Sequence, residues 1–429
     1  MKQMSLKKQA MITAGSSALM RALGFGIRLW ISRMLGAEAL GIMELASGAH
    51  MLALTPAAAG LPSAVSRLTA KAKSEEQKQL TLYAGRRAAI WMGCLITPLF
   101  FFLSPLIAEA LGDGRTLPAL LFFAPCVLTV GVSSVYDGYF FGQGKALPPA
   151  LSEGAEQMAR IGVLAAFVFL IPRVTVAYRA ALPALASSVG EAVGLIVILL
   201  LAGSIPSYRK HPDERRMRKQ LARLSAPLLL NRLCHTALRS LCGIVIPLRL
   251  MAAGYGRPEA LSQFGMFNGM VMPLMFLPGM VSGALSTVGG PAVARCGTKK
   301  AEKQLILRLL LSALGTGISS AAALYFLSPL ISRYFYRLPE LSRLIRFACP
   351  LAVLLPLQQV SGGMLTGLGL QKHSLWASLL GSVALLLCTW QWVLRMGISG
   401  AAFASIAGHG LTLFCEMVYL LSRTRNKDL

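Results

Sequence analysis

Charged residues are scarce in this sequence of 429 residues, and acidic residues are the scarcest. Asp, Glu, Lys and Arg make up 14% of the chain, whereas a soluble domain carries about a quarter. Only 17 residues are acidic against 42 Lys and Arg, which gives a formal net charge of +25. Hydrophobic residues reach 55%, and the mean hydropathy is +0.62. Together with the long apolar runs described below, these values exclude a soluble enzyme, a disordered chain and a secreted disulfide scaffold.

Motifs for catalysis and cofactor binding are missing as well. The eight cysteines are scattered and form no Cys-x-x-Cys pair, so we interpret them as small buried hydrophobic residues. The sequence contains no phosphate-binding Walker motif, no dinucleotide-binding glycine fingerprint and no Gly-x-Ser-x-Gly turn. We therefore expect no metal, no cofactor, no ATP hydrolysis and no covalent chemistry.

Long apolar windows dominate the chain. A helix needs about 20 mainly apolar residues to cross the hydrocarbon core of a bilayer. Windows of this kind, bounded by charged or turn residues, predict twelve spans, at roughly 11–33, 39–66, 80–108, 117–142, 153–171, 178–203, 224–250, 260–288, 304–328, 342–369, 374–394 and 399–421. The sequence therefore predicts an all-α integral membrane protein.

The basic residues predict the orientation of these spans. With the N-terminus in the cytoplasm, the cytoplasmic segments hold 23 Lys and Arg residues and the outer segments hold 10. Since cytoplasmic loops are rich in Lys and Arg, this favours an even number of spans and two cytoplasmic termini. The most basic segment, 209–223, lacks interleaved aromatic residues. We expect it to contact anionic lipid headgroups and not nucleic acid.

Short segments of the chain recur six spans later. Phe102–Ile107 (FLSPLI) in the third span recurs as Phe326–Ile331 in the ninth, 224 positions further on, and Phe123–Ala124 recurs as Phe347–Ala348 at the same offset. Because six is even, the two halves have the same orientation in the membrane, as in transporters built from two parallel six-helix repeats. This predicts an N-terminal lobe, a basic cytoplasmic linker and a C-terminal lobe, at 1–205, 206–223 and 224–429.

Arginines within the spans follow the same repeat. Arg21 and Arg28 are seven residues apart in the first span, and Arg232 and Arg239 have the same spacing in the seventh, with His235 between them. Seven residues place two side chains close to one face of a helix. If the halves face each other, the four arginines line one electropositive cavity. Arginine stays charged and its planar fork suits phosphate oxygens, so we expect an anionic substrate, with a diphosphate as a natural ligand.

Other arrangements of these charges remain open. Arg28 and Glu44 lie toward the same side of the membrane and could form an ion pair, and the side chain of Arg232 could extend to the membrane interface. Glu156 and Arg160 are four residues apart on a helix, which favours a structural pair.

Two further polar residues have no partner that the sequence reveals. Glu191 lies in the middle of its span and could couple transport to an ion, carry a proton or pair with an arginine on another helix. Asn268 in the eighth span could contribute to the cavity, although a hydrogen bond between helices is the favoured interpretation.

The order of several short motifs resembles a known family, the stage V sporulation protein B-like polysaccharide transporters of the multidrug, oligosaccharidyl-lipid and polysaccharide exporter superfamily. These motifs are Met20–Phe25 with Arg28, Gly60–Arg67, Gly138–Gly144, Glu156–Ile161, and Pro278 with Leu285–Ser286 and Pro291–Ala292. The similarity extends over most of the chain.

The resemblance implies two six-helix lobes around a central cavity that opens alternately to each side of the bacterial cytoplasmic membrane. It also implies flipping of undecaprenyl-diphosphate-linked sugars, peptidoglycan precursors included, by a non-enzymatic transporter whose arginines on the first and seventh spans hold the diphosphate. We expect this chain to act as a monomer. The matching positions are Arg21, Arg28, Arg232 and Arg239. The substrate-binding residues that we expect are these four arginines together with Glu44, His235 and Asn268.

One departure from the family pattern keeps alternatives open. Members of this branch usually have fourteen helices, whereas twelve is the number in the drug-extruding branch. A cation-coupled multidrug exporter is therefore the second hypothesis, although organic cations would be repelled by four arginines. A non-transporting membrane scaffold for cell-wall or spore-coat assembly is the third.

Overall fold

The computed structural model describes residues 23–167, 174–203, 211–294, 296 and 298–425. Regular structure in this part of the chain is helical, without strands. Residues 23–35 form the first described helix. The elements that follow are α2 (Ala37–Ala58), α3 (Leu61–Lys71), α4 (Glu75–Ala110), η1 (Gly114–Thr116), α5 (Leu117–Gly142), α6 (Leu147–Phe167), α7 (Val176–Ala202), α8 (Glu214–Ala252), α9 (Arg257–Phe264), η3 (Gly265–Val271), α10 (Met272–Phe276), α11 (Gly279–Ala294), α12 (Lys299–Leu330), η4 (Ile331–Tyr336), α13 (Leu341–Ala348), α14 (Leu351–Gly367), α15 (Gln371–Met396) and α16 (Ile398–Arg425).

Each of the twelve predicted windows coincides with one helix or with a broken helix wherever its residues are described. Eight helical segments within the described ranges are long and apolar enough to cross a membrane: Glu75–Ala110, Gly114–Gly142, Val176–Ala202, Glu214–Ala252, Lys299–Tyr336, Leu341–Gly367, Gln371–Met396 and Ile398–Ser422. The window 39–66 is broken before Gly60, whose φ of 82° ends the helical path. The window 260–288 is divided by the π-helix η3 and by a turn at Pro278. The predicted all-α membrane fold is confirmed.

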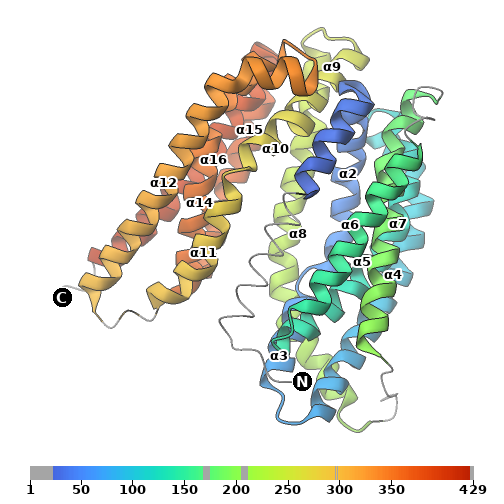
Figure 1. The fold of residues 1–429 in the computed structure, drawn as a ribbon, viewed down its shortest axis with the longest axis vertical. Coiled ribbons are helices and arrows are strands. Elements are labelled where there is room, and N and C mark those ends of the chain that lie inside the picture. The colour runs from blue at the N-terminus through green and yellow to red at the C-terminus, as the bar shows by residue number, and fades with distance from the viewer. Residues whose placement is uncertain (1–22, 168–173, 204–210, 295, 297, 426–429) are drawn as a thin grey trace. The chain divides into compact units, whose positions relative to one another are not determined.

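The described residues divide into two compact units. The first unit consists of the described residues up to Leu35 together with Ile42–Ser240, and the second of Gly36–Gly41 with the residues from Leu241 onwards. In the first unit α5 packs on α3, α4 and α7, and in the second α14 packs on α11, α12 and α16. Long helices run side by side within each unit (Figure 1). The two predicted lobes, 1–205 and 224–429, were inferred from the sequence repeat, whereas these units are defined by contacts. The lobes therefore stay a prediction.

The recurring segment FLSPLI has the same environment in α4 and in α12. Ser104 and Ser328 are fully buried, and each hydroxyl donates to a carbonyl of the preceding turn. Phe102 and Phe326 are each 77% exposed. In the most apolar stretch of α4, and likewise of α12, only 17% of the residues are buried. The corresponding share is 61% in η1–α5 and 56% in α13–α14. The third and ninth spans thus lie at the outside of their units, and the fourth and tenth lie at the centre.

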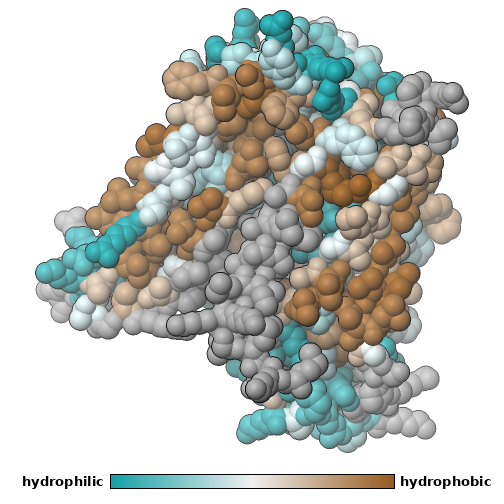
Figure 2. Space-filling view, in the orientation of Figure 1, coloured by the Kyte–Doolittle hydropathy of each residue, from teal (hydrophilic) through white to brown (hydrophobic). Residues whose placement is uncertain are grey.

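The surface matches a bilayer environment. Figure 2 shows hydrophobic side chains over the middle of the helices and hydrophilic side chains at their ends. α4 and α12 each begin at a hydrophilic end, where Ser74 and Thr298 respectively cap the helix by accepting a hydrogen bond from a backbone N–H group. The apolar band covers the exposed faces that hydrocarbon can contact.

Within the second unit, glycines let the start of α2 approach α9 and η3 closely. A Cβ atom at Gly41 would collide with the carbonyl oxygen of Leu261, and one at Gly265 would collide with the carbonyl oxygen of Ala37. Small residues at such crossings allow backbones to come into direct van der Waals contact, which replaces the hydrophobic driving force that lipid does not provide. This contact explains why Gly36–Gly41 belongs to the second unit.

We therefore expect Gly265→Ala to destabilise the second unit. Forcing a methyl group into a packed contact costs about 1–3 kcal/mol. The matched control is Gly315→Ala in α12, where an added Cβ has no atom within 4 Å. Thermal unfolding in detergent should occur at a lower temperature for Gly265→Ala and at an unchanged or higher temperature for Gly315→Ala. Equal unfolding temperatures for the two variants would contradict the tight crossing.

Candidate functional site

In the first unit α2 and α8 pack against each other in antiparallel directions. The Ser240 hydroxyl donates to the carbonyl of Gly48 at 2.7 Å, and the Thr55 hydroxyl donates to that of Thr236 at 3.2 Å. The contacts continue beyond Thr55, with rising residue numbers on α2 and falling residue numbers on α8. They reach Gly60, just after α2, where an added Cβ would lie 2.6 Å from the Ser225 carbonyl oxygen. These contacts fix the height of each α8 residue relative to α2.

Arg28 and Glu44 form an ion pair at the α2 end of this arrangement. Arg28 Nη2 lies 2.5 Å from Glu44 Oε1, and the Glu44 side chain is 9% exposed against 41% for Arg28. The predicted pairing alternative is therefore confirmed. Glu44 lies one turn before Gly48 on α2, and Ser240 is opposite Gly48. Arg239 directly precedes Ser240. The Arg28 side chain, which contacts Glu44, therefore lies about one helical turn away from Arg239 along the helix axis.

Arg232 and Arg239 are both exposed on α8, and His235 between them is half-buried. Because a guanidinium in contact with hydrocarbon costs several kcal/mol, an exposed arginine in the middle of a membrane-spanning helix needs water or an anion. α8 has 39 residues, which is about 58 Å of helix and exceeds the hydrocarbon thickness. Its basic first turns therefore extend into water while Arg232 and Arg239 stay inside the span.

The remaining predicted residues lie elsewhere or outside the described ranges. Arg21 belongs to the residues that the structure does not describe. Asn268 is half-buried in the π-helix η3 of the second unit. The other three predicted arginines, Arg28, Arg232 and Arg239, all belong to the first unit. Their joint action on a substrate stays a prediction.

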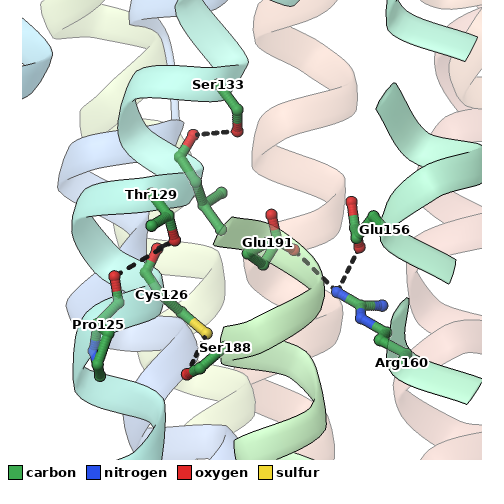
Figure 3. Close-up of polar contacts among 9 residues, drawn as sticks. Pro125, Cys126, Thr129, Ser133, Glu156, Arg160, Ser188 and Glu191 are labelled. Atoms are coloured by element: carbon green, nitrogen blue, oxygen red, sulfur yellow. Dashed lines mark hydrogen bonds and ion pairs between the residues drawn. The ribbon is translucent and has the colours of Figure 1, made fainter. Parts of the chain in front are cut away.

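A second polar cluster surrounds Arg160 in the first unit (Figure 3). Arg160 Nη2 lies 2.8 Å from Glu191 Oε1 on α7, and the same atom pairs with Glu156, four residues earlier on α6. Figure 3 shows the two carboxylates pointing toward one guanidinium from two helices. The predicted i,i+4 pair is confirmed, and Glu191 pairs with an arginine on another helix. Its proposed ion-coupling role stays a prediction.

Small residues bring the two helices of this cluster together. A Cβ at Gly190 would lie 2.9 Å from the Glu156 carbonyl oxygen, and the Ser152 hydroxyl donates to the Gly194 carbonyl at 2.8 Å. The backbone of α7 thus lies directly against α6. This close approach is what lets Glu191 reach Arg160.

Acidic groups outnumber basic groups around Arg160. Asp137 on α5 is half-buried and interacts electrostatically with Glu153 and Glu156. The cluster therefore joins four carboxyl groups, those of Asp137, Glu153, Glu156 and Glu191, with one guanidinium. An excess of negative charge in a low-dielectric region favours binding of a proton or another cation.

Sequence reasoning overlooked two acidic residues in the interior of predicted spans. Asp137 lies in the window 117–142, and Glu416 lies in the window 399–421. Glu416 is 2% exposed. A complete inventory of acids inside the apolar windows would have found both, because an intramembrane acid is a functional candidate by default.

Comparisons with known proteins agree with this architecture. A family model for polysaccharide biosynthesis proteins matches residues 6–296. The chain is 29% identical over 425 residues to stage V sporulation protein B of Bacillus subtilis (strain 168). This alignment covers 95% of this chain and 82% of that protein. It is 23% identical over 446 residues to the lipid II flippase MurJ of the same organism, which covers 93% and 79%.

The fold itself is found in a solved transporter structure. The inward-facing conformation of a multidrug resistance MATE family transporter of the MOP superfamily superposes with a TM-score of 0.77, at 17% identity and with 95% of each chain covered. The predicted twelve-helix membrane fold and the family resemblance drawn from the motifs are both confirmed.

The Arg160 cluster predicts unequal effects of its members on stability. Arg160→Met leaves two half-buried carboxylates without their cation, which costs at most about 3–5 kcal/mol, the cost of breaking a fully buried ion pair. Glu191→Gln should cost less, because Glu156 still pairs with Arg160. In the double variant Arg160→Met with Glu191→Gln, part of the loss should be recovered, since only one carboxylate remains. Unfolding in detergent measures all three variants, and strictly additive effects would contradict the shared pair.

Proposed function

Because the chain belongs to the polysaccharide biosynthesis protein family, we propose that it is a flippase that moves an undecaprenyl-diphosphate-linked oligosaccharide or peptidoglycan precursor across the bacterial cytoplasmic membrane. The relatives support this substrate class, since one of them is a lipid II flippase and another a sporulation protein. The protein works by alternating access, and it binds the substrate differently in its two conformations. It acts as a monomer with both termini in the cytoplasm.

The observation that carries this proposal is the exposure of Arg232 and Arg239 inside a membrane-spanning helix. Two guanidinium groups on one face of α8, about 10 Å apart along the axis, match an elongated polyanion better than a monovalent one. Arg28 lies near the level of Arg239. Arg21 precedes Arg28 by seven residues in the sequence. In our proposal these four arginines bind the diphosphate, while His235 contributes hydrogen bonds.

Glu44 sets how strongly Arg28 can act on a substrate. Its carboxylate already occupies one Nη of Arg28, so a diphosphate oxygen competes with it for the guanidinium. In the proposed cycle Arg28 exchanges Glu44 for the diphosphate in the binding conformation. Such an exchange keeps the arginine paired in both states, which avoids leaving it unpaired in a low-dielectric region.

Basic turns at the start of α8 are the proposed contact with anionic lipid headgroups. An open hollow there is lined by Pro212, Arg215, Arg216, Lys219, Gln220 and Arg223. Arg87 of α4 pairs with Glu214 at 2.6 Å and ties this end of α8 to the first unit. Each basic residue near an anionic surface contributes about 1 kcal/mol of attraction.

A cation-coupled multidrug exporter of the MATE type is the second candidate. The specific observation in its favour is the acid-rich cluster around Arg160, because excess carboxylates can bind a proton, a metal ion or an organic cation. In the flippase proposal the same cluster, with Glu191 as its central acid, serves ion coupling and not substrate binding. The charge of the transported molecule distinguishes the two candidates.

The flippase proposal predicts charge-selective binding. Purified protein should bind an undecaprenyl-diphosphate-sugar, and Arg28→Ala or Arg232→Ala should each weaken binding by roughly tenfold or more, the equivalent of about 1.4 kcal/mol per factor of ten. Arg308→Ala, which removes an exposed arginine from α12, is the matched control and should bind as the wild type does. Binding of organic cations in preference to the diphosphate would favour the multidrug exporter.

Removal of the competing carboxylate should have the opposite effect. Glu44→Gln keeps the size of the side chain but removes its charge, so Arg28 becomes available and the site becomes more positive. We expect this variant to bind the diphosphate lipid several times more tightly than the wild type, as measured by isothermal titration or by native mass spectrometry. If Glu44→Gln weakened binding instead, Glu44 would position Arg28 and the exchange described above would be wrong.

A further inference from the structure

Glu416 lies inside the second unit at the meeting point of three helices. It belongs to α16, within the membrane-spanning segment Ile398–Ser422, and is 2% exposed. The hydroxyl of Ser374 at the start of α15 donates to Glu416 Oε1 at 2.9 Å, and the hydroxyl of Ser361 on α14 donates to Oε2. Both carboxyl oxygens are thus satisfied by neutral groups.

No basic side chain forms an ion pair with Glu416 among the described residues. α14 carries no ionisable residue at all. On α15, Lys372 and His373 directly precede Ser374, and both are exposed. The ring of His373 contacts that of Tyr419, with 4.6 Å between the ring centroids. On α16, His409 lies two turns before Glu416, and its Nδ1 is 2.8 Å from Gln358 Oε1. Arg308 on α12 and Arg343 on α13 are exposed.

This environment differs from that of Glu191, which shares an arginine with Glu156. An ionised carboxyl group without a cation in the hydrocarbon region costs several kcal/mol, and two neutral hydroxyl donors do not compensate for it. A bound cation removes this cost. The question is therefore which cation fits.

The packing around the carboxyl group favours a proton. The Ser374 hydroxyl is in direct hydrogen-bond contact with Oε1, so no gap separates these two oxygens. On the α14 side Gly362 presses against the same oxygen, since a Cβ there would lie 3.2 Å from it. A metal ion requires several oxygen ligands arranged around a central space, whereas each oxygen of Glu416 is in direct contact with one hydroxyl group. The proton needs no such space.

We propose that Glu416 binds a proton in one conformation of the transport cycle and releases it to water in the other, so that transport is coupled to the proton gradient. This inference rests on the transport function proposed above. A serine hydroxyl both donates and accepts, so Ser361 and Ser374 can hydrogen-bond to the acid and to the carboxylate. Loss of the proton leaves a charge at the junction of α14, α15 and α16, which favours a conformation in which water reaches the site.

Infrared difference spectroscopy on the purified full chain tests proton binding directly. Raising the pH should remove a carboxylic-acid C=O band from the wild type, and this band should be absent from Glu416→Gln at every pH. Glu340→Gln, an exposed site in the same unit, is the matched control and should keep the band. Glutamine has the shape of the protonated acid, so the variant retains the packing. Persistence of the band in Glu416→Gln would overturn the proposal.

Transport into liposomes tests the coupling. An imposed pH gradient should accelerate transport of an undecaprenyl-diphosphate-sugar by the wild type, and Glu416→Gln should lose this acceleration while the control Glu340→Gln keeps it. Undiminished acceleration in Glu416→Gln would overturn the coupling role. A wild type that shows the Glu416 band yet moves no lipid-linked sugar would contradict the proposed function and leave proton binding at Glu416 supported.

Discussion

Hydrocarbon does not solvate a charge, and the charged side chains within the spans of this chain meet that constraint in three different ways. Arg160 is surrounded by carboxylates from its own helix and from α7. Arg232 and Arg239 are exposed and so require water or an anion beside α8. Glu416 is enclosed by neutral donors alone. A structural pair, a hydrated path and a protonatable acid are the respective physical solutions.

The same constraint governs how the helices pack. Lipid is as apolar as leucine, so helices in a membrane associate through close contact and hydrogen bonds and not through hydrophobic burial. Glycines at Gly41, Gly190 and Gly265 provide that contact, and hydroxyl groups such as that of Ser152 provide the hydrogen bonds. The functional groups depend on it, since Glu191 reaches Arg160 only because the α7 backbone touches α6.

Most of the fold follows from the sequence because hydrophobic windows and turn residues act locally. All twelve windows coincide with helix in the described ranges, and the FLSPLI repeat identified two helices with the same environment. The break at Gly60 was not predicted, since a run of apolar residues does not reveal where its helix bends, whereas the proline itself indicates the break at Pro278. The extent of each span is therefore predictable, while its internal breaks depend on tertiary contacts.

Partners across helices were harder to predict than spans. The pair Glu156–Arg160 follows from a spacing of four, and Arg28–Glu44 was open as one of two arrangements. Glu191 needed a contact with a residue 31 positions away, for which the sequence carries no spacing rule. Glu416 shows the same limit more sharply, because its significance lies in the absence of a basic partner among the described residues, and only packing reveals that.

The distribution of charge in the first unit favours the flippase over the multidrug exporter. In the first unit the carboxylates gather around Arg160 on α5, α6 and α7, whereas the exposed arginines stand on α8 beside α2. A cation exporter needs its acids where the substrate enters, but the exposed groups inside the span of α8 are basic. An anion transporter that draws on a cation gradient needs both kinds of site, kept apart so that the coupling cation and the anionic substrate do not neutralise each other. The buried acids and the exposed arginines of this chain meet that requirement, which is why the flippase is the better supported function.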